Sequence, residues 1–141
     1  MARILIIEDS AVSMKLTTFL VQIAGHTVLC AVDAETGVKL VRTAKPDLIL
    51  MDILLPGMDG LAATALLKAD PTTAAIPIIV LTSLMTKADE RNAFLAGCNA
   101  YIVKPLARQK LQAAIEDLLH ASIDNFLPEN RPYTATTEPR H

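Results

Sequence analysis

Acidic, hydroxyl and basic side chains stand directly after four short apolar runs of this sequence. They are Glu8, Asp9, Asp52, Thr82 and Lys104. Three carboxylates brought to one place repel each other, and a hard divalent cation with oxygen ligands relieves that repulsion. Mg²⁺ suits one or two carboxylates, waters and a substrate phosphate, whereas zinc and copper are not suggested because no His or Cys stands at these positions. A cation, a lysine and a hydroxyl together can stabilise an anionic phosphoryl group.

Asp52 is the best candidate for a nucleophile that receives such a group, because the run before it is expected at the centre of a sheet. Taken alone, each residue has an ordinary structural explanation. Asp9 or Ser10 could cap a helix, and Thr82 could cap a helix or form a turn. Asp52 could also form a turn, and Lys104 could be a solvated charge. Their joint occurrence at four run ends favours a shared site.

The apolar runs are rich in β-branched residues and alternate with longer segments of helical periodicity. We predict strands over residues 4–7, 27–31, 47–51, 77–81 and 100–103, and helices over residues 10–24, 34–44, 61–69, 87–96 and 108–121. This (βα)5 alternation predicts the α/β class, with a doubly wound, parallel five-stranded sheet covered by helices on both faces. Ligands of such sheets bind outside the carboxyl ends of the strands, where the polar residues stand.

Two of the predicted helices have notable positions. In the first, the apolar stripe typical of a core-facing surface is formed by Val12, Leu16, Phe19, Leu20 and Ile23. In the second, Gly37 weakens the helix by about 1 kcal/mol relative to alanine.

The chain has 141 residues, of which 52% are hydrophobic and 20% charged, and its 13 basic and 15 acidic side chains give a net charge of −2. This length predicts one domain with its own core and leaves no room for a second one, such as a DNA-binding module. The charge offers no basic face for phosphate backbones, so direct nucleic-acid binding is not expected. The first apolar run is too short for a signal peptide, and no run reaches the ~18 residues of a membrane span. We therefore expect a soluble, cytoplasmic protein without membrane insertion.

The cysteines and histidines form no metal-binding or catalytic pattern. Cys30 and Cys98 lie 68 residues apart in apolar segments, and we expect both to be buried free thiols. His26, His120 and His141 share no spacing with each other or with acids, and we expect them on the surface or in turns.

The last twenty residues, 122–141, differ in composition from the rest of the chain. They contain three of the eight prolines and show no helical period, which predicts a mostly disordered tail. They also contain Phe126, Leu127 and Tyr133, so two of the five aromatic residues of the chain lie there. Chance explains this composition, and a docking or dimerising arm is the alternative.

The ordered set of motifs resembles the response-regulator receiver domain, the CheY-like family that accepts phosphate from a sensor histidine kinase. The segments that carry the resemblance are residues 4–9 (ILIIED), 46–52 (PDLILMD), 55–60 (LPGMDG), 78–83 (IIVLTS) and 97–105 (GCNAYIVKP). The resemblance covers about residues 2–121 and implies a flavodoxin-like fold with strand order 2-1-3-4-5. It divides the chain into a receiver domain at 1–121 and a tail at 122–141.

The resemblance also implies roles for the polar residues. Asp52 is implied to be the phosphoacceptor, and Thr82 and Lys104 are implied to contact the phosphoryl oxygens. The implied cofactor is Mg²⁺, with the ligands Glu8, Asp9, Asp52 and the backbone carbonyl of Leu54.

Further implied features concern switching and docking. The bond between Lys104 and Pro105 is implied to be cis. Tyr101 is implied to turn inward as Thr82 moves toward the phosphate, although half-buried strand tyrosines are common without such a role. The residues implied to meet the kinase or phosphotransfer partner are Ala11, Met14 and Lys15.

The implied function is that of a stand-alone response regulator in a two-component system or phosphorelay. Its expected partners are a sensor histidine kinase or histidine phosphotransfer protein, and a downstream protein that reads the surface of the fourth helix, fifth strand and fifth helix. We expect a monomer or weak dimer. We expect no turnover enzyme, although such a protein catalyses its own aspartyl phosphorylation and dephosphorylation.

Three other functions compete with this one. A scaffold that works without phosphorylation remains the main alternative. A flavin carrier is disfavoured because the acidic Glu8 and Asp9 stand where a phosphate-binding loop is needed. A turnover phosphatase needs an acid two residues past the nucleophile, where Leu54 stands instead. Because neither Leu54 nor Leu84 can orient an attacking water, we expect the aspartyl phosphate to decay slowly.

Overall fold

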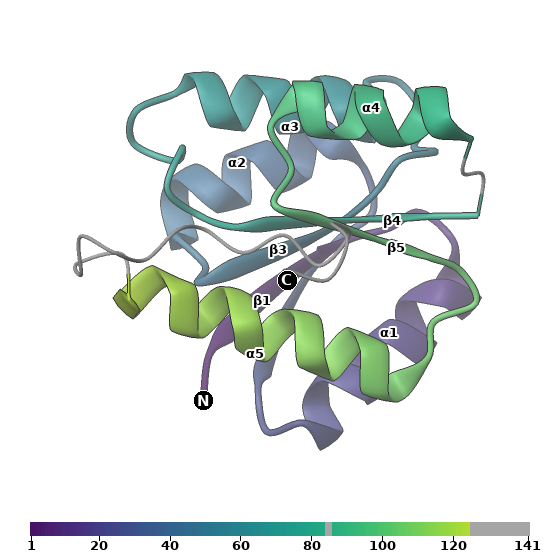
Figure 1. The fold of residues 1–141 in the computed structure, drawn as a ribbon, viewed down its shortest axis with the longest axis vertical. Coiled ribbons are helices and arrows are strands. Elements are labelled where there is room, and N and C mark those ends of the chain that lie inside the picture. The colour runs from purple at the N-terminus through teal and green to yellow at the C-terminus, as the bar shows by residue number, and fades with distance from the viewer. Residues whose placement is uncertain (84–85, 125–141) are drawn as a thin grey trace.

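The computed structural model describes residues 1–83 and 86–124 and contains one parallel sheet of five strands in the order β2-β1-β3-β4-β5 (Figure 1). The strands are β1 (Arg3–Ile7), β2 (Thr27–Ala31), β3 (Leu48–Asp52), β4 (Ile78–Thr82) and β5 (Ala100–Val103). The predicted class, strand number and strand order are confirmed. Leu84 and the tail side chains Phe126, Leu127 and Tyr133, like His141, lie outside the described residues.

Five helices cover the two faces of the sheet. They are α1 (Ala11–Ile23), α2 (Ala34–Ala44), α3 (Gly60–Ala69), α4 (Lys87–Ala96) and α5 (Arg108–Asp124). Helices α1 and α5 cover one face, and α2, α3 and α4 cover the other (Figure 1). The chain therefore buries two hydrophobic clusters, one on each side of the sheet.

The central strands are apolar on both sides because each side packs on a cluster. In β1, Ile4 and Ile6 belong to the cluster under α1 and α5, whereas Leu5 and Ile7 belong to the other. All five residues of β3 are buried. This burial explains the continuous apolar runs in the sequence.

The strand register brings the chemically active residues to one edge. Ile7 pairs with Met51, and Asp52 pairs with Leu81, so the residue after Ile7 stands level with Asp52. Thr82 pairs with Val103 at the same edge. The polar residues after β1, β3, β4 and β5 therefore meet at the carboxyl edge.

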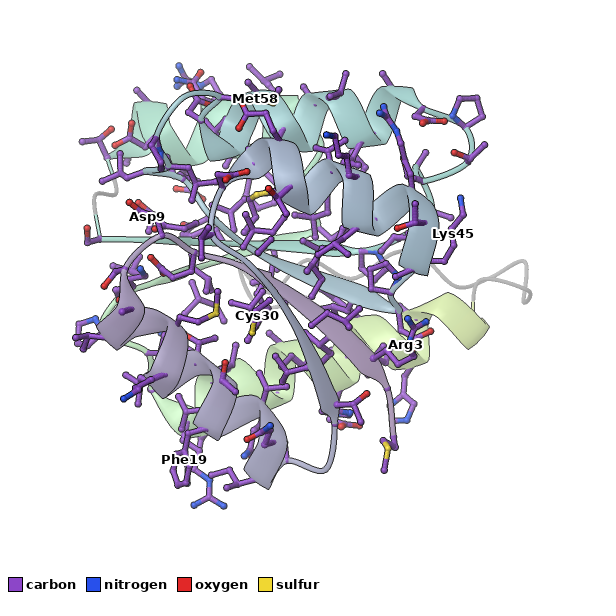
Figure 2. All side chains as sticks on the ribbon, turned by 180° about the vertical axis from the view of Figure 1, so that it is seen from behind. Arg3, Asp9, Phe19, Cys30, Lys45 and Met58 are labelled. Atoms are coloured by element: carbon purple, nitrogen blue, oxygen red, sulfur yellow. The ribbon has the colours of Figure 1, made fainter. Side chains whose placement is uncertain are left out.

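Helix α1 packs on the sheet with a different stripe from the one predicted. Its buried residues are Thr17, Leu20 and Val21. Of the predicted stripe, Leu20 alone is buried, and the exposed side chains are Val12, Leu16, Phe19 and Ile23. Figure 2 shows Phe19 on the outer side of this helix. Both stripes satisfy the helical period, and periodicity does not say which of two stripes faces the core.

The predicted burial was wrong for two side chains, Cys30 and His26. Cys30 is exposed, because it lies on β2, an edge strand that has one neighbouring strand. Cys98 is buried as expected, and burial raises the pKa of its thiol to about 12. His26 is buried rather than exposed, with Nδ1 accepting a 3.0 Å hydrogen bond from the Ala2 N–H. This contact joins distant parts of the chain, so local sequence does not reveal it.

Helix α5 ends at Asp124, three residues beyond the predicted end, so residues 122–124 continue the helix rather than begin a tail. None of the helices in the described part of the chain is both long and apolar enough to cross a membrane.

Candidate functional site

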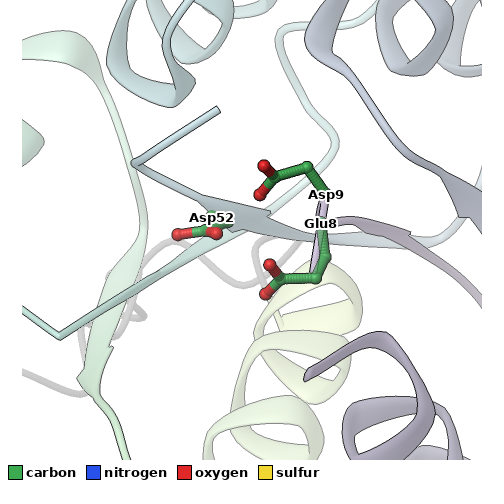
Figure 3. A group of neighbouring side chains, drawn as sticks. All are labelled: Glu8, Asp9 and Asp52. Carbon is green, nitrogen blue, oxygen red and sulfur yellow. The ribbon is translucent and has the colours of Figure 1, made fainter. Parts of the chain in front are cut away.

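Three carboxylates meet at the carboxyl edge of the sheet. Glu8 and Asp9 follow β1, and Asp52 ends β3. One oxygen from each lies within 4.8 Å of the others, and Figure 3 shows the three side chains grouped together. Glu8 and Asp52 are buried, whereas Asp9 is exposed to solvent. The site is therefore an acidic cluster that opens to water on the Asp9 side.

Local backbone contacts hold Glu8 in this cluster. The Glu8 N–H donates to the Ala31 carbonyl at 3.0 Å, which continues the pairing of β1 with β2. The Ser10 N–H donates to Glu8 Oε2 at 3.1 Å. Ser10 also caps α1, with its hydroxyl accepting from the Ser13 N–H. Ser10 thus combines the capping role that the sequence allowed with support for the acidic cluster.

Asp52 is a buried carboxyl in an unfavourable electrostatic setting. Burial, followed by the hydrogen bond and the charge of Glu8, raises the pKa of Asp52 to about 6. Lys104 and the Leu54 N–H act in the opposite direction. The Leu54 N–H donates to Asp52 Oδ1 at 3.2 Å, which orients the carboxyl.

Lys104 supplies positive charge to the cluster. Its Nζ donates to Glu8 Oε1 at 2.8 Å and lies 3.7 Å from Asp52 Oδ2. Its backbone N–H donates to the Thr82 carbonyl at 2.7 Å, and its peptide bond to Pro105 is cis. Thr82 is almost fully buried beside this segment. One lysine against three carboxylates leaves the cluster net negative.

Gly60 packs against the backbone at Asp52, a contact that sequence reasoning missed. It begins α3, and its N–H donates to the Ile53 carbonyl at 2.9 Å. A Cβ at this position would overlap the backbone carbonyl oxygen of Asp52. Asp59 and Gly60 lie within the segment 55–60 (LPGMDG), and such an Asp-Gly pair is the sequence signal of a turn or a close backbone approach.

Comparison with known proteins identifies the family. The model of the response regulator receiver domain matches residues 4–116. This chain is a member of that family. Receiver domains belong to two-component signalling and interact with histidine kinases and downstream targets. They are generally signalling proteins rather than classical enzymes.

Individual relatives of this receiver domain are matched over nearly their whole length. Protein PilH of Pseudomonas aeruginosa is 40% identical over 119 residues, covering 84% of this chain and 98% of PilH. The polar-differentiation response regulator DivK of Brucella anthropi is 36% identical over 116 residues, covering 82% of this chain and 94% of DivK. The receiver domain of a Pseudomonas aeruginosa sensor histidine kinase, solved with a magnesium ion in its active-site cleft, has a TM-score of 0.79 at 31% identity, covering 84% of this chain and 98% of that one.

The remaining sequence-predicted residues are the switch tyrosine and the three docking residues of α1. Tyr101 is half-buried on β5 and makes an edge-to-face contact with Phe94 of α4, with ring centroids 5.7 Å apart. At the start of α1, next to Glu8 and Asp9 in the chain, stand Ala11, Met14 and Lys15. Of these three, Ala11 and Lys15 are exposed and Met14 is half-buried against the core.

The donor set of the receiver domain fits a hard divalent cation. It offers carboxylate oxygens, carries net negative charge and is open to water at Asp9. Mg²⁺ takes such oxygen ligands and keeps several waters. Glu8, Asp9 and Asp52 are the side chains that could hold it.

Proposed function

We propose that this receiver domain accepts a phosphoryl group on Asp52 from a phosphohistidine of a sensor histidine kinase or histidine phosphotransfer protein. The observation that carries the proposal is the cluster of Glu8, Asp9 and Asp52 within 4.8 Å, with Lys104 against it. A buried carboxyl beside a cation site and a lysine is suited to phosphoryl transfer, which depends on positioning and charge stabilisation.

In this step an ionised oxygen of Asp52 attacks phosphorus. A bond forms between that oxygen and phosphorus, and the bond from phosphorus to the imidazole nitrogen breaks. The imidazole leaves with the electron pair, and it leaves as a neutral ring when its other nitrogen is protonated in the phosphohistidine. Because the pKa of Asp52 is raised to about 6, the carboxylate that attacks predominates at neutral pH.

Mg²⁺ is the cofactor that we propose for this site, held by Glu8, Asp9, Asp52 and the backbone carbonyl of Leu54. When bound, it neutralises charge on the phosphoryl oxygens. The carboxylates of Glu8 and Asp9 orient the site, and the Leu54 N–H holds Oδ1 of Asp52. The other carboxylate oxygen, Oδ2, is then the one that faces Lys104.

We propose that the Lys104 ammonium changes its partner from the Glu8 carboxylate to the arriving phosphoryl group. Its Nζ now pairs with Glu8 at 2.8 Å and stands 3.7 Å from Asp52. An arriving phosphoryl group places new negative charge within reach of this ammonium. The hydroxyl of Thr82, which ends β4 at the same edge, is proposed to donate to a phosphoryl oxygen.

The proposed output begins at Thr82 and passes to Tyr101 on the neighbouring strand. Tyr101 pairs with Val80 in the sheet and contacts Phe94 of α4. Movement of Thr82 toward the phosphoryl group makes room for Tyr101, which changes the surface of α4, β5 and α5 that a downstream protein reads.

The test is the covalent state of Asp52. Incubate the full chain with Mg²⁺ and acetyl phosphate and determine its intact mass; we expect a gain of one phosphoryl group that is absent in Asp52→Asn. The matched control is Asp117→Asn, which removes an exposed carboxylate from α5 and should still gain the group. If neither acetyl phosphate nor a phosphorylated histidine partner gives an adduct on wild type, the proposal fails and the phosphorylation-independent scaffold replaces it.

A further inference from the structure

The outer face of α1 carries four apolar side chains that the domain does not cover. Val12, Leu16, Phe19 and Ile23 are exposed by 79%, 47%, 58% and 41%. Their spacing of four, three and four residues places them on one line along the helix. We call this line the α1 stripe.

The α1 stripe is unusual within the described part of the molecule. The exposed face of α5 is polar and includes Arg108, Gln109, Lys110, Glu116, Asp117 and His120. Helices α3 and α4 each expose one large apolar side chain, Leu66 and Leu95. Single exposed apolar residues are ordinary, whereas a contiguous line of them marks an interaction surface.

A cavity continues the α1 stripe toward α5. It has a volume of about 310 Å³. Its lining includes Leu16, Thr17, Pro105 and Leu106, together with Ser83 and with Lys104 of the acidic cluster. Most of its walls are apolar, and its size is at the lower end of the ~300–1,000 Å³ of small-ligand pockets, so it has room for an aromatic side chain. The stripe and the cavity together form one apolar track.

The chain beyond α5 starts at the right place to reach this track. Helices α1 and α5 lie against the same face of the sheet (Figure 1), and both follow strands whose carboxyl ends are at the site. Both helices therefore end at the opposite, amino edge. The 17 residues from 125 to 141 continue from there.

The length of these 17 residues is sufficient. Fully extended, they span at most about 56 Å, from ~3.3 Å per residue. The 13 residues of α1 are about 20 Å long at 1.5 Å per residue. Residues 125–141 can therefore turn back at the amino edge and run along α1 toward the site.

The composition of this segment fits an apolar track. It carries Phe126, Leu127 and Tyr133, and its two glutamates are balanced by two arginines, so no net side-chain charge opposes docking. Its prolines restrict the backbone, which reduces the entropy lost on binding. A tethered segment also acts at an effective concentration near the millimolar range.

We propose that residues 125–141 dock in cis on the α1 stripe and its cavity, with Phe126, Leu127 and Tyr133 as the apolar anchors. A second copy of the chain fits this surface less well. A line of four side chains on a 13-residue helix falls short of the ~800 Å² per partner that a stable dimer buries.

One consequence rests on the proposed function. The α1 stripe adjoins Ala11, Met14 and Lys15, where the phosphodonor protein is proposed to bind. A docked segment must be displaced before that protein can approach Asp52. The segment therefore slows transfer from a protein donor more than transfer from a small phosphodonor, which needs less of this surface to reach Asp52.

The docking itself is tested without phosphorylation. Place a spin label at Asn130→Cys in the full chain with Cys30→Ser, since Cys30 is exposed and Cys98 is buried with a thiol pKa of about 12. We expect the label to broaden the backbone amide signals of Leu16 and Phe19. The broadening should vanish in Phe126→Ser/Leu127→Ser/Tyr133→Ser and persist in Thr134→Ala/Thr136→Ala/Thr137→Ala.

A matched pair on the domain side gives the second control. Phe19→Ser should remove the broadening of the α1 amides, and Leu66→Ser, which alters an exposed apolar side chain of α3, should keep it. Broadening on another face, or none at all, overturns the proposal. Broadening between a labelled chain and a separate isotope-enriched chain also overturns it, in favour of a second copy as the occupant.

The regulatory consequence has its own measurement. With limiting phosphorylated histidine partner, the triple serine variant of the segment should accept phosphate about tenfold faster than wild type, as for a surface that is nine-tenths covered. With acetyl phosphate, the difference between the two rates should be well below tenfold. Equal rates with the protein donor overturn the shielding role. If neither wild type nor the triple serine variant is phosphorylated, the proposed function is contradicted. Docking is then decided by the spin-label result alone.

Discussion

Single residues at the carboxyl edge balance charges that no one of them could hold alone. Glu8 is buried, and its charge is tolerated because the Lys104 ammonium lies 2.8 Å away and the Ser10 N–H donates to it. The Lys104 ammonium stabilises the Asp52 carboxylate less, because its Nζ lies 3.7 Å from Asp52 Oδ2. Folding therefore makes it harder to ionise Asp52 next to Glu8, and this should lower the free energy of unfolding when Asp52 is ionised.

The raised pKa of Asp52 predicts how stability depends on pH without Mg²⁺. The folded chain holds the Asp52 proton up to about pH 6, whereas the unfolded chain releases it near the ordinary aspartate pKa of 3.8. Between these values the folded state binds more protons, so the free energy of unfolding falls as pH rises. Asp52→Asn should thus be more stable than wild type at pH 7.5, by about 1–3 kcal/mol, with the difference shrinking toward pH 4.5.

Urea unfolding in EDTA at both pH values measures this difference. Asp117→Asn, which changes an exposed carboxylate on α5, should not reproduce it. Equal stabilities of wild type and Asp52→Asn at pH 7.5 would contradict an electrostatically strained Asp52.

The side chain of Leu54 leads to a prediction about the lifetime of the phosphorylated state. Leu54 orients Asp52 through its backbone, while its side chain is 53% exposed and cannot activate water. Leu54→Glu introduces a carboxylate that can orient an attacking water, so the phosphoryl group should be lost at least severalfold faster. Loss of radiolabel from purified protein measures the rate, and Leu66→Glu on α3 serves as the control. Loss within seconds from wild type would disprove the slow decay expected from the sequence.

At the scale of elements, the sequence predicts the strands, from their local apolar pattern, and the shared edge of the site, from the parallel topology. Short apolar runs define the strands, and parallel pairing brings their carboxyl ends together, so Asp52, Thr82 and Lys104 could be placed at one edge before any coordinates. The face of α1 could not be predicted, because Val12 and Val21 belong to different stripes of equal helical period. Tertiary packing decides between such stripes, and the sequence carries no record of it.

The role of Gly60 was hidden from the sequence for a related reason. A glycine after Asp59 suggests a turn, whereas the structure places it against the backbone of β3 at Asp52. Gly37 is similar: it was expected only to weaken α2, yet a Cβ there would overlap the side chain of Ile7. Both positions depend on contacts between separate elements.

Replacement of Gly60 by alanine should move the start of α3 away from β3. The added Cβ overlaps the Asp52 carbonyl, so we expect a loss of about 1–3 kcal/mol in stability and a slower gain of phosphate on Asp52. The matched variant is Gly25→Ala, because Gly25 has a φ of +96° and no atom within 4 Å of a built Cβ. It should cost about 1 kcal/mol through backbone strain alone and leave the phosphorylation rate intact.

Chemical denaturation and a phosphorylation time course separate the two glycine effects. If Gly60→Ala accepts phosphate as fast as Gly25→Ala, the close approach of α3 is structural and does not position Asp52.

At the scale of the whole molecule, the acidic site is formed at the ends of strands that also build the hydrophobic core. Strand β1 contributes to both hydrophobic clusters and then delivers Glu8 and Asp9, and β3 is buried along its full length before it delivers Asp52. Anything that binds these carboxylates is therefore linked to global unfolding, because the unfolded chain does not assemble them.

Mg²⁺ should consequently stabilise the entire fold, and more so at higher pH. Binding to the folded state adds about 2.7 kcal/mol to the free energy of unfolding when Mg²⁺ is at 100 times its Kd. Protons compete for Asp52 below about pH 6, so the shift in Tm at a fixed Mg²⁺ concentration should be larger at pH 7.5 than at pH 5. Thermal unfolding of wild type, Asp9→Asn and Asp117→Asn at both pH values tests this, with the shift lost in Asp9→Asn alone. A shift that is equal at both pH values, or that survives in Asp9→Asn, would place the cation outside the acidic cluster.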